Sequence, residues 1–310
     1  MPNQPIKESN FLDNTEMGLG AWAWGDRFFW QYGHGYTEED IAAAFRASIA
    51  GGVNLVDTAE VYGGGRSEHL VGLFIKNSSQ KVMVATKFFP IPYRFTKNSV
   101  VRALRTSLER LELDHVYLYQ LHWPSPVVSN ETYLEGLAMA VKAGLTEKVG
   151  VSNYDIKQMQ QAQKILSKYG IPLASNQVEY HLLDRRVERS GLLDRCKEMG
   201  VRLIAYSPLA QGLLTGKYTT ETPPPGARRR KYNALLKDLP PLIALMTEIG
   251  KGHEGKTPAQ VALNWVICKG GLPIPGAKTA NQAEQNNGAT GWRLTQEEIK
   301  ALEDASDKIT

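Results

Sequence analysis

Four side chains suited to acid–base chemistry follow three consecutive apolar segments of the sequence. Asp57 and Tyr62 lie five residues apart after the first of these segments, Lys87 ends the next and His122 ends the third. A tyrosine hydroxyl with a pKa of about 10 is a poor proton donor at neutral pH, and a lysine ammonium beside it is expected to lower that pKa. An aspartate would keep the lysine charged, and a histidine could donate a hydrogen bond to a carbonyl oxygen. The residue types therefore predict a site at which Tyr62 protonates a carbonyl oxygen.

The glycines at 63–65, directly after Tyr62, admit two interpretations. A glycine-rich loop that opens a helix can bind phosphate through its backbone N–H groups. The same glycines can instead form a sharp turn that places Tyr62 and starts the helix expected at 66–76. The first interpretation assigns the segment to nucleotide binding, and the second assigns it to catalysis.

The segments that must position these residues alternate between strand and helix patterns. Short apolar segments predict strands at 17–22, 53–58, 81–87, 116–122, 148–153, 173–180, 201–209 and 271–276. Amphipathic stretches predict helices at 37–51, 66–76, 96–112, 131–144, 155–168, 188–199, 238–250 with 258–269, and 280–288. Strict alternation of this kind calls for a parallel sheet with helical crossovers.

The number of strand–helix units in 310 residues matches a (β/α)8 TIM barrel, so we expect an α/β fold with a single domain over residues 1–310. A doubly wound sheet is the alternative, but its G-x-G-x-x-G fingerprint does not match GLGAWAWG at the first strand–helix turn. The segment 295–309 opens with a capping box, Thr295 to Glu298, and predicts an extra C-terminal helix. The long connection at 211–237 would lie over the active-site face of a barrel.

The composition is typical of a soluble protein that binds a small molecule. A net charge of +4 is too small to predict a nucleic-acid partner, and no apolar segment approaches the ~20 residues that span a membrane. The segment 1–10 lacks the apolar stretch of a secretory signal. Cys196 and Cys268 have no metal-ligand spacing, so neither a metal site nor a disulfide framework is expected. We expect a cytoplasmic monomer.

Taken together, the motifs resemble the aldo-keto reductase superfamily along the whole chain. They are GLGAW, VNLVDTAEVYG, VATK, LYQLHWP, GVSNY, NQVEYH, AYSPLAQGLLTGKY and IPGAKTANQAEQN, one for each strand in order. The long connection after the seventh strand is most similar to the branch that includes the potassium-channel β-subunits. The resemblance implies NADPH-dependent reduction of an aldehyde or ketone to an alcohol. It makes Tyr62 the general acid, Lys87 with its partner Asp57 the group that tunes it, and His122 the residue that orients the carbonyl.

The resemblance also implies where the cofactor binds. The nicotinamide would stack on Tyr206, and its carboxamide would bind Ser152, Asn153 and Gln177. The other residues expected to bind the cofactor are Trp22, Asp57, Ser207, Leu209, Gln211, Gly212, Lys217, Arg228, Gly276, Lys278, Gln282, Gln285 and Asn286. An apolar substrate pocket is expected from Trp24, Trp30, Phe89 and Trp123. Because the phosphates then bind near the seventh and eighth strands, the glycines at 63–65 are expected to form a turn.

Some features depart from the family pattern or leave alternatives open. Gln282 stands where many relatives carry an arginine for the 2′-phosphate of NADPH, so Lys278 is expected to supply that charge. Apart from Arg228, the run RRRK at 228–231 is expected to form a solvated loop. One alternative function is a cofactor-sensing regulatory subunit with little turnover, although the channel β-subunits lack the histidine found at His122. Another is a lyase that forms a Schiff base on Lys87.

Overall fold

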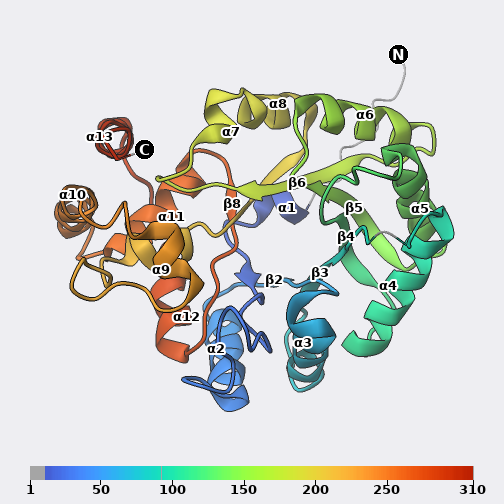
Figure 1. The fold of residues 1–310 in the computed structure, drawn as a ribbon, viewed down its shortest axis with the longest axis horizontal. Coiled ribbons are helices and arrows are strands. Elements are labelled where there is room, and N and C mark those ends of the chain that lie inside the picture. Colours follow the sequence, from blue (N-terminus) through green and yellow to red (C-terminus); the bar gives the residue numbers. More distant parts are fainter. Residues whose placement is uncertain (1–10, 92, 310) are drawn as a thin grey trace.

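The barrel predicted from the sequence is confirmed by a computed structural model that describes residues 11–91 and 93–309. Residues 1–10, where a secretory signal was predicted to be absent, lie outside the described residues. Eight parallel strands pair in chain order, and helices surround them (Figure 1). The strands are β1 (Leu19–Gly20), β2 (Leu55–Asp57), β3 (Met83–Phe88), β4 (Val116–Leu121), β5 (Thr146–Ser152), β6 (Leu173–Glu179), β7 (Arg202–Tyr206) and β8 (Leu272–Pro273).

The outer helices follow the strands one unit at a time, as the alternation predicted. They are α2 (Glu38–Ala50), α3 (Arg66–Lys76), α4 (Lys97–Leu111), α5 (Asn130–Lys142), α6 (Ile156–Ser167), α7 (Arg186–Arg189), α8 (Leu192–Met199), α10 (Pro240–Gly252), α11 (Pro258–Cys268), α12 (Ala280–Asn287) and α13 (Gln296–Ser306). The single helix expected at 188–199 is wrong, because Gly191 adopts a left-handed backbone with φ of 76° and separates α7 from α8. The predicted capping box of α13 is present at Thr295 and Glu298.

The barrel closes between β8 and β1, and both of these strands are shorter than predicted. Gly18 N donates to Pro273 O and Gly20 N donates to Pro275 O, each at 3.0 Å. Ile274, between the two prolines, donates its N–H to Ala205 of β7 at 3.0 Å. Proline has no N–H, so this side of β8 can only accept hydrogen bonds from β1. The closure is therefore made by a few one-way bonds rather than by a full ladder.

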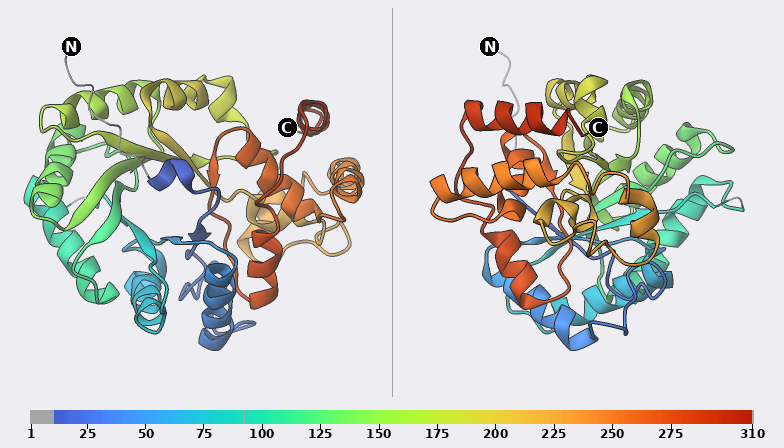
Figure 2. Two further views of the ribbon diagram at one scale, coloured as in Figure 1. Left: turned by 180° about the vertical axis from the view of Figure 1, so that it is seen from behind. Right: turned by 60° about the vertical axis from the view of Figure 1, so that its left-hand side comes forward.

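The apolar residues form two clusters, one between sheet and helices and one inside the barrel. The inner cluster includes Leu55, Ala85, Leu118 and Ile204 from different strands, together with Leu12, which is fully buried. Leu12 belongs to α1 (Phe11–Asn14), a short helix that the sequence did not predict. Seen from behind, α1 crosses the middle of the barrel end (Figure 2). The end of the barrel opposite the strand carboxyl ends is thus filled with packed side chains.

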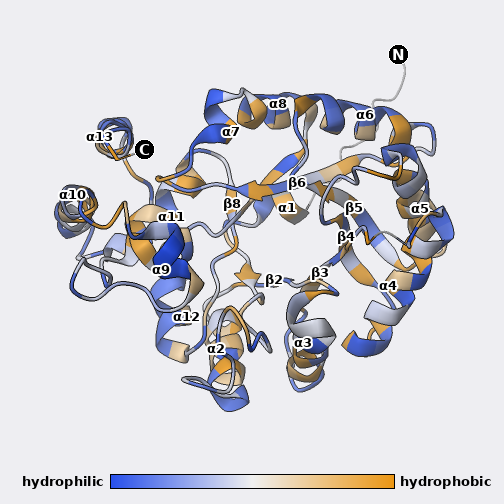
Figure 3. Cartoon of the chain, in the orientation of Figure 1, coloured by the Kyte–Doolittle hydropathy of each residue, from blue (hydrophilic) through white to orange (hydrophobic). Residues whose placement is uncertain are grey.

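The connection after β7 is more ordered than the sequence suggested. It contains η2 (Ala210–Thr215) and α9 (Ala227–Tyr232), so residues 228–231 form a helix and not the expected loop, although 229–231 are exposed to solvent as expected. The helix α9 is strongly hydrophilic (Figure 3), yet the Arg228 side chain on it is buried. None of the helices in the described ranges is long and apolar enough to cross a membrane.

Candidate active site

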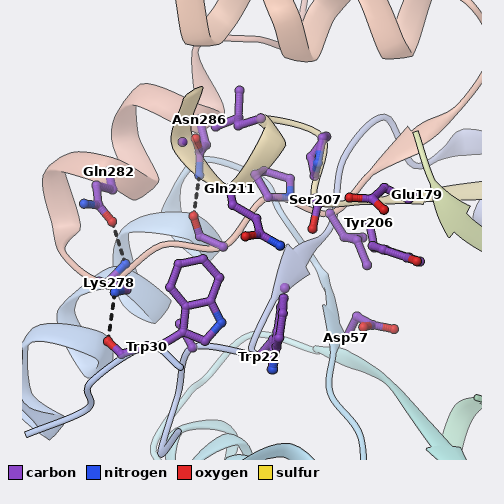
Figure 4. Close-up of a pocket in the computed structure, with 18 of the residues that line it drawn as sticks. Trp22, Trp30, Asp57, Glu179, Tyr206, Ser207, Gln211, Lys278, Gln282 and Asn286 are labelled. Atoms are coloured by element: carbon purple, nitrogen blue, oxygen red, sulfur yellow. Dashed lines mark hydrogen bonds between the residues drawn. The ribbon is translucent and has the colours of Figure 1, made fainter. Parts of the chain in front are cut away.

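A cavity of about 860 Å³ opens at the carboxyl ends of the strands. In a TIM barrel this is the face on which active sites form. Figure 4 shows Trp30 and Lys278 toward one end of the cavity and Asp57 and Tyr206 toward the other. Every residue that the sequence predicted to bind the cofactor lies on its wall. The structure therefore brings these residues together, and their binding role stays a prediction.

Three of the predicted catalytic residues are in direct contact. The Lys87 ammonium is fully buried, forms an ion pair with the Asp57 carboxylate and donates to Thr58 O at 2.7 Å. Its Nζ atom lies 3.4 Å from the Tyr62 hydroxyl and 4.9 Å from the centre of that ring. Lys87 itself does not line the cavity, whereas Asp57 and Tyr62 do. Lys87 is thus separated from the cavity by Asp57 and Tyr62, and it can act on a bound molecule through these residues or through its charge.

The pKa of Tyr62 differs from the sequence prediction. Burial and the nearby negative charge of Asp57 raise the pKa of Tyr62 well above the ordinary value of a phenol. Burial also lowers the pKa of Lys87, while the charge of Asp57 opposes this change. The expected lowering of the Tyr62 pKa by Lys87 is therefore wrong, because burial of the phenol and the negative charge of Asp57 raise this pKa instead. The phenol keeps its proton at neutral pH, which is the form that a proton donor needs.

His122 faces Tyr62 across the mouth of the barrel. The two ring centroids lie 5.6 Å apart with the planes at 79°, and the backbone N–H of His122 donates to Phe88 O at 2.9 Å. Burial, helped by the positive charge of Lys87, lowers the pKa of His122 to about 3. The imidazole is therefore neutral, and its buried Nδ1 atom has no hydrogen-bond partner among the described residues. A neutral imidazole can position a carbonyl group without carrying charge.

The glycines after Tyr62 form a tight turn, η1 (Tyr62–Gly65), and not a phosphate loop. Gly63, Gly64 and Gly65 have φ values of 56°, 65° and 92°, a backbone region that strongly favours glycine. A Cβ atom on Gly63 would lie 2.7 Å from the carbonyl oxygen of Gly25 in the loop after β1. None of the three glycines lines the cavity. The turn places Tyr62 at the strand ends and leads into α3.

A row of amides extends from the Asp57 carboxylate, and the sequence analysis found only part of it. Gln177 Nε2 donates to Asp57 Oδ2 at 2.8 Å, and Gln120 Nε2 points to the same oxygen at 3.4 Å. Ser175 Oγ in turn donates to Gln120 Oε1 at 3.2 Å. Gln120 was missed, although it lies two residues before His122, and strand residues two apart face the same side. That spacing was the signal that could have found it.

The ends of β5, β6 and β7 are joined by a second set of hydrogen bonds. Tyr206 donates its hydroxyl proton to Asn153 Oδ1 at 3.0 Å, and Asn153 Nδ2 donates to His122 O at 3.2 Å. Ser152 Oγ donates to Gln177 O at 2.8 Å. These bonds fix the Tyr206 ring and the amide of Asn153 on the cavity wall. The arrangement offers a flat aromatic surface beside amide donors and acceptors.

Three cations line the end of the cavity that lies under α9 and after β8. They are Lys217, Arg228 and Lys278, and within the described ranges none of them forms an ion pair with a carboxylate. The buried Arg228 Nε and Gln211 Oε1 atoms also have no hydrogen-bond partner there. Burial, followed by repulsion from Arg228 and Lys217, lowers the pKa of Lys278 to about 8. Unpaired, partly buried cations of this kind are suited to binding an anionic group.

Trp30 joins two of these cations and does not simply line a substrate pocket. The centre of its ring lies 4.9 Å from Arg228 Cζ and 4.7 Å from Lys278 Nζ, and its carbonyl accepts from Lys278 Nζ at 3.2 Å. Arg228 also donates to Gln211 O at 3.2 Å. Cation–π contacts of this geometry are favourable when partly desolvated. Trp30 therefore connects the loop after β1 with the loops after β7 and β8.

The other three predicted substrate-pocket residues lie in three different environments. Trp123, 45% exposed, lies on the cavity wall directly after His122. Phe89 is not on the cavity wall but packs edge-on against the His122 ring at 5.5 Å. Placing Trp24 in the pocket is wrong, because it is fully buried, packs against Phe45 and Phe74, and donates Nε1–H to Ala277 O at 2.9 Å. Trp24 is a core residue.

Residues to which the sequence analysis assigned no role also line the cavity. Val61, 41% exposed, precedes Tyr62, and Glu179 lies at the end of β6. Lys231 of α9 donates to Glu179 Oε1 at 3.2 Å and ties α9 to that strand end. Burial opposes ionisation of Glu179, but His181 and Lys231 lower its pKa to about 2. The Glu179–Lys231 ion pair therefore stays charged at neutral pH.

Comparison with known proteins assigns the family. A sequence model described as the Aldo/keto reductase family matches residues 16–307. The chain belongs to the aldo/keto reductase family. It is therefore an oxidoreductase of this family, and the unpaired cations described above are consistent with a nicotinamide cofactor, which solved relatives hold.

Curated and solved aldo/keto reductases cover nearly the whole chain. Pyridoxal reductase, chloroplastic, of Arabidopsis thaliana is 42% identical over 308 residues, which is 95% of this chain and 84% of the plant protein. Methylglyoxal reductase YeaE of Escherichia coli is 32% identical over 306 residues, covering 98% and 95%. The crystal structure of an aldo/keto reductase from Klebsiella pneumoniae in complex with NADP and acetate has a TM-score of 0.74 and 31% identity, covering 93% and 90%.

Proposed function

We propose that this aldo/keto reductase uses NADPH to reduce aldehydes and ketones to alcohols, the reaction of an NADP-dependent alcohol dehydrogenase. The observation that carries the proposal is the protonated Tyr62 hydroxyl, held 3.4 Å from Lys87 at the mouth of a cavity with three unpaired cations. When bound, the reduced nicotinamide supplies the hydride for the carbonyl carbon. Tyr62 donates the proton to the carbonyl oxygen.

The residues around Tyr62 have separate tasks in this reaction. The ammonium of Lys87 stabilises the negative charge that develops on Tyr62 as its proton leaves. Asp57 keeps Lys87 charged, and Gln177 holds Asp57 in place. His122, neutral and next to Tyr62, positions the carbonyl oxygen.

The cavity wall fits a phosphate-bearing dinucleotide. Tyr206 would carry the nicotinamide ring, with Ser152, Asn153 and Gln177 around its carboxamide. The partnerless Arg228 Nε atom and the ammonium groups of Lys217 and Lys278 would bind the phosphates. Lys278 is assigned to the 2′-phosphate, which makes NADPH the preferred cofactor over NADH.

The substrate side of the cavity favours uncharged aldehydes with an apolar body. Val61 and Trp123 are the immediate chain neighbours of Tyr62 and His122, and both are exposed on the wall. A carbonyl oxygen held by Tyr62 and His122 would thus place its substituent against these two side chains. The names of the plant and E. coli relatives mention pyridoxal and methylglyoxal, and both compounds belong in a substrate panel with benzaldehyde. The proposed state is a cytoplasmic monomer, although the plant relative is named as chloroplastic.

The test is cofactor consumption by the purified protein with each compound of this panel, measured as the loss of NADPH absorbance. We expect turnover with NADPH, and a kcat/KM for NADPH at least about tenfold above that for NADH. Tight NADPH binding without turnover on any aldehyde would contradict the proposal and favour the regulatory-subunit alternative, which the comparisons do not support.

A further inference from the structure

One buried carboxylate outside the cavity has no role in the proposed reaction. Glu68 of α3 is fully buried. It accepts a hydrogen bond from Thr86 Oγ1 at 2.5 Å and from Arg110 Nε at 2.7 Å, and Arg110 Nη2 lies 2.6 Å from Glu68 Oε2. Removing a carboxylate from water is costly unless it is paired and hydrogen-bonded. Each oxygen of Glu68 meets this requirement.

Glu68, Thr86 and Arg110 form a hydrogen-bonded cluster, and Thr86 connects it to the strand that carries Lys87. Thr86, which donates to Glu68, directly precedes Lys87 on β3. The negative charge of Glu68 also acts on Lys87, in the same direction as the charge of Asp57 and against the effect of burial on the Lys87 pKa. Glu68 is therefore a second carboxylate that favours the charged form of Lys87.

The other side of the cluster supports the turn that carries Tyr62. A Cβ atom on Gly65, the last residue of η1, would lie 2.8 Å from Arg110 Cδ and 2.9 Å from Arg110 Nε. The Arg110 side chain thus packs directly against this glycine on its way from α4 to Glu68. Arg110 Nη2 also donates to Ser107 Oγ at 3.2 Å on its own helix. Hydrogen bonds to Glu68 and to Ser107 therefore fix the conformation of the Arg110 side chain.

We propose that the Glu68–Arg110 ion pair is a positioning element for catalysis, which holds the turn at 62–65 against α4 and keeps the Tyr62 hydroxyl beside Lys87. The inference rests on the proposed role of Tyr62 and deepens it. Neither Glu68 nor Arg110 lines the cavity, so both act through the turn and through Lys87. Small displacements of a reacting group have large effects on rate. An ion pair that does not touch the substrate can therefore affect kcat by fixing the position of Tyr62.

The chain provides a matched control on the same two helices. Lys76 at the end of α3 pairs with Glu112, the residue that follows α4, at 2.7 Å. This ion pair is exposed, with side-chain exposures of 67% and 49%, and lies at the other end of α3 from the turn. If tethering α3 to α4 were all that mattered, the two ion pairs would have similar effects.

The experiment compares Glu68→Gln, Arg110→Lys and Glu112→Gln in the full chain, by kcat and KM for benzaldehyde, Kd for NADPH and thermal unfolding. For Glu68→Gln we expect kcat to fall about tenfold or more, with KM and Kd within about twofold of the wild-type values. The kcat of Arg110→Lys should lie between those of Glu68→Gln and the wild type, because the lysine keeps a cation opposite Glu68 but lacks the two parallel donors of the guanidinium. Glu112→Gln should match the wild type.

The pH profile gives a readout that loss of stability alone would not move. Removing the negative charge of Glu68 makes the charged form of Lys87 less favourable, so the basic limb of kcat should shift to lower pH in Glu68→Gln. The other ionisable groups that face Lys87 are Asp57, Tyr62 and His122, and they are unchanged in this variant.

A wild-type kcat and pH profile in Glu68→Gln would overturn the proposal. A fall in kcat matched by equal rises in KM and in the Kd for NADPH would overturn it as well. If Glu68→Gln does not fold, Arg110→Lys decides, and a wild-type kcat there would overturn the proposal as well. Failure of the proposed function is distinguishable, because it would appear as full activity in Tyr62→Phe.

Discussion

The Nζ atom of Lys87 lies 3.4 Å from the hydroxyl oxygen of Tyr62, at the far end of hydrogen-bond length. The shorter contacts of the Lys87 ammonium are with the Asp57 carboxylate and the carbonyl oxygen of Thr58. Burial and the charge of Asp57 keep the phenol protonated, and the position of Lys87 still places a positive charge where the phenolate would form. Lys87 is therefore placed to stabilise the phenolate as the proton leaves, and not to deprotonate Tyr62 beforehand.

The turn after Tyr62 can be tested by two neighbouring substitutions. Gly64→Ala meets no atom within 4 Å and carries only the left-handed backbone penalty, about 1–2 kcal/mol in the free energy of unfolding. Gly63→Ala adds a clash with the backbone of Gly25. We expect Gly63→Ala to lower kcat more than Gly64→Ala, with NADPH affinity unchanged in both. A selective loss of NADPH affinity in either variant would restore the phosphate-loop interpretation.

The pH dependence of kcat/KM tests the state of His122. Because the pKa of His122 is lowered to about 3, the imidazole stays neutral above about pH 5, and its ordinary titration near pH 6.5 should be missing. We expect no acid limb near that pH in the wild type. A limb near about pH 6.5 that disappears in His122→Asn would show instead that the imidazole titrates in the normal range.

The cofactor affinity should depend on pH through Lys278. Its pKa of about 8 in the protein means that the ammonium is present below this pH and is lost above it. Binding of a phosphate favours the charged form, so the Kd for NADPH should be nearly constant between about pH 6.5 and 7.5, where the 2′-phosphate is mostly dianionic, and rise by up to about tenfold per pH unit above about pH 8. Lys278→Arg should bind NADPH without this dependence, because an arginine stays charged. The same rise in Lys278→Arg would assign the titration to another group.

Two tryptophans separate packing from substrate contact. Trp24→Ala should lower the free energy of unfolding by about 3–5 kcal/mol, since the side chain is fully buried in the core. Trp123→Ala should leave stability nearly unchanged and raise KM for benzaldehyde more than KM for methylglyoxal, because the larger aldehyde loses an apolar wall. Chemical denaturation and steady-state kinetics measure the two effects. Equal KM changes for both aldehydes would remove Trp123 from the substrate pocket.

The sequence predicted the barrel because its alternating segments are long, regular and numerous. The same regularity located the site, since Asp57, Lys87 and His122 all end or follow parallel strands and must meet at one edge. The positions of individual side chains in the loops between strands and helices could not be predicted in the same way. Trp24 and Trp30 are six residues apart in one loop, and only the loop conformation sends the first into the core and the second between two cations.

Burial explains the other differences. The pattern RRRK resembles a solvated charge run, and nothing in its spacing shows that Arg228 alone turns inward onto Trp30. The direction of the Tyr62 pKa also depends on desolvation, which follows from packing around the whole site and not from the residue types. Gln120 is the exception, because its spacing from His122 was visible in the sequence.

The most direct measurement of the central claim is the kcat of Tyr62→Phe with NADPH and benzaldehyde, alongside the Kd for NADPH. The substitution removes only the hydroxyl that lies next to Lys87. If Tyr62 is the proton donor, kcat should fall by about 10²–10⁴-fold while the Kd for NADPH stays within about twofold of the wild-type value. A Tyr62→Phe variant with wild-type kcat would contradict the account.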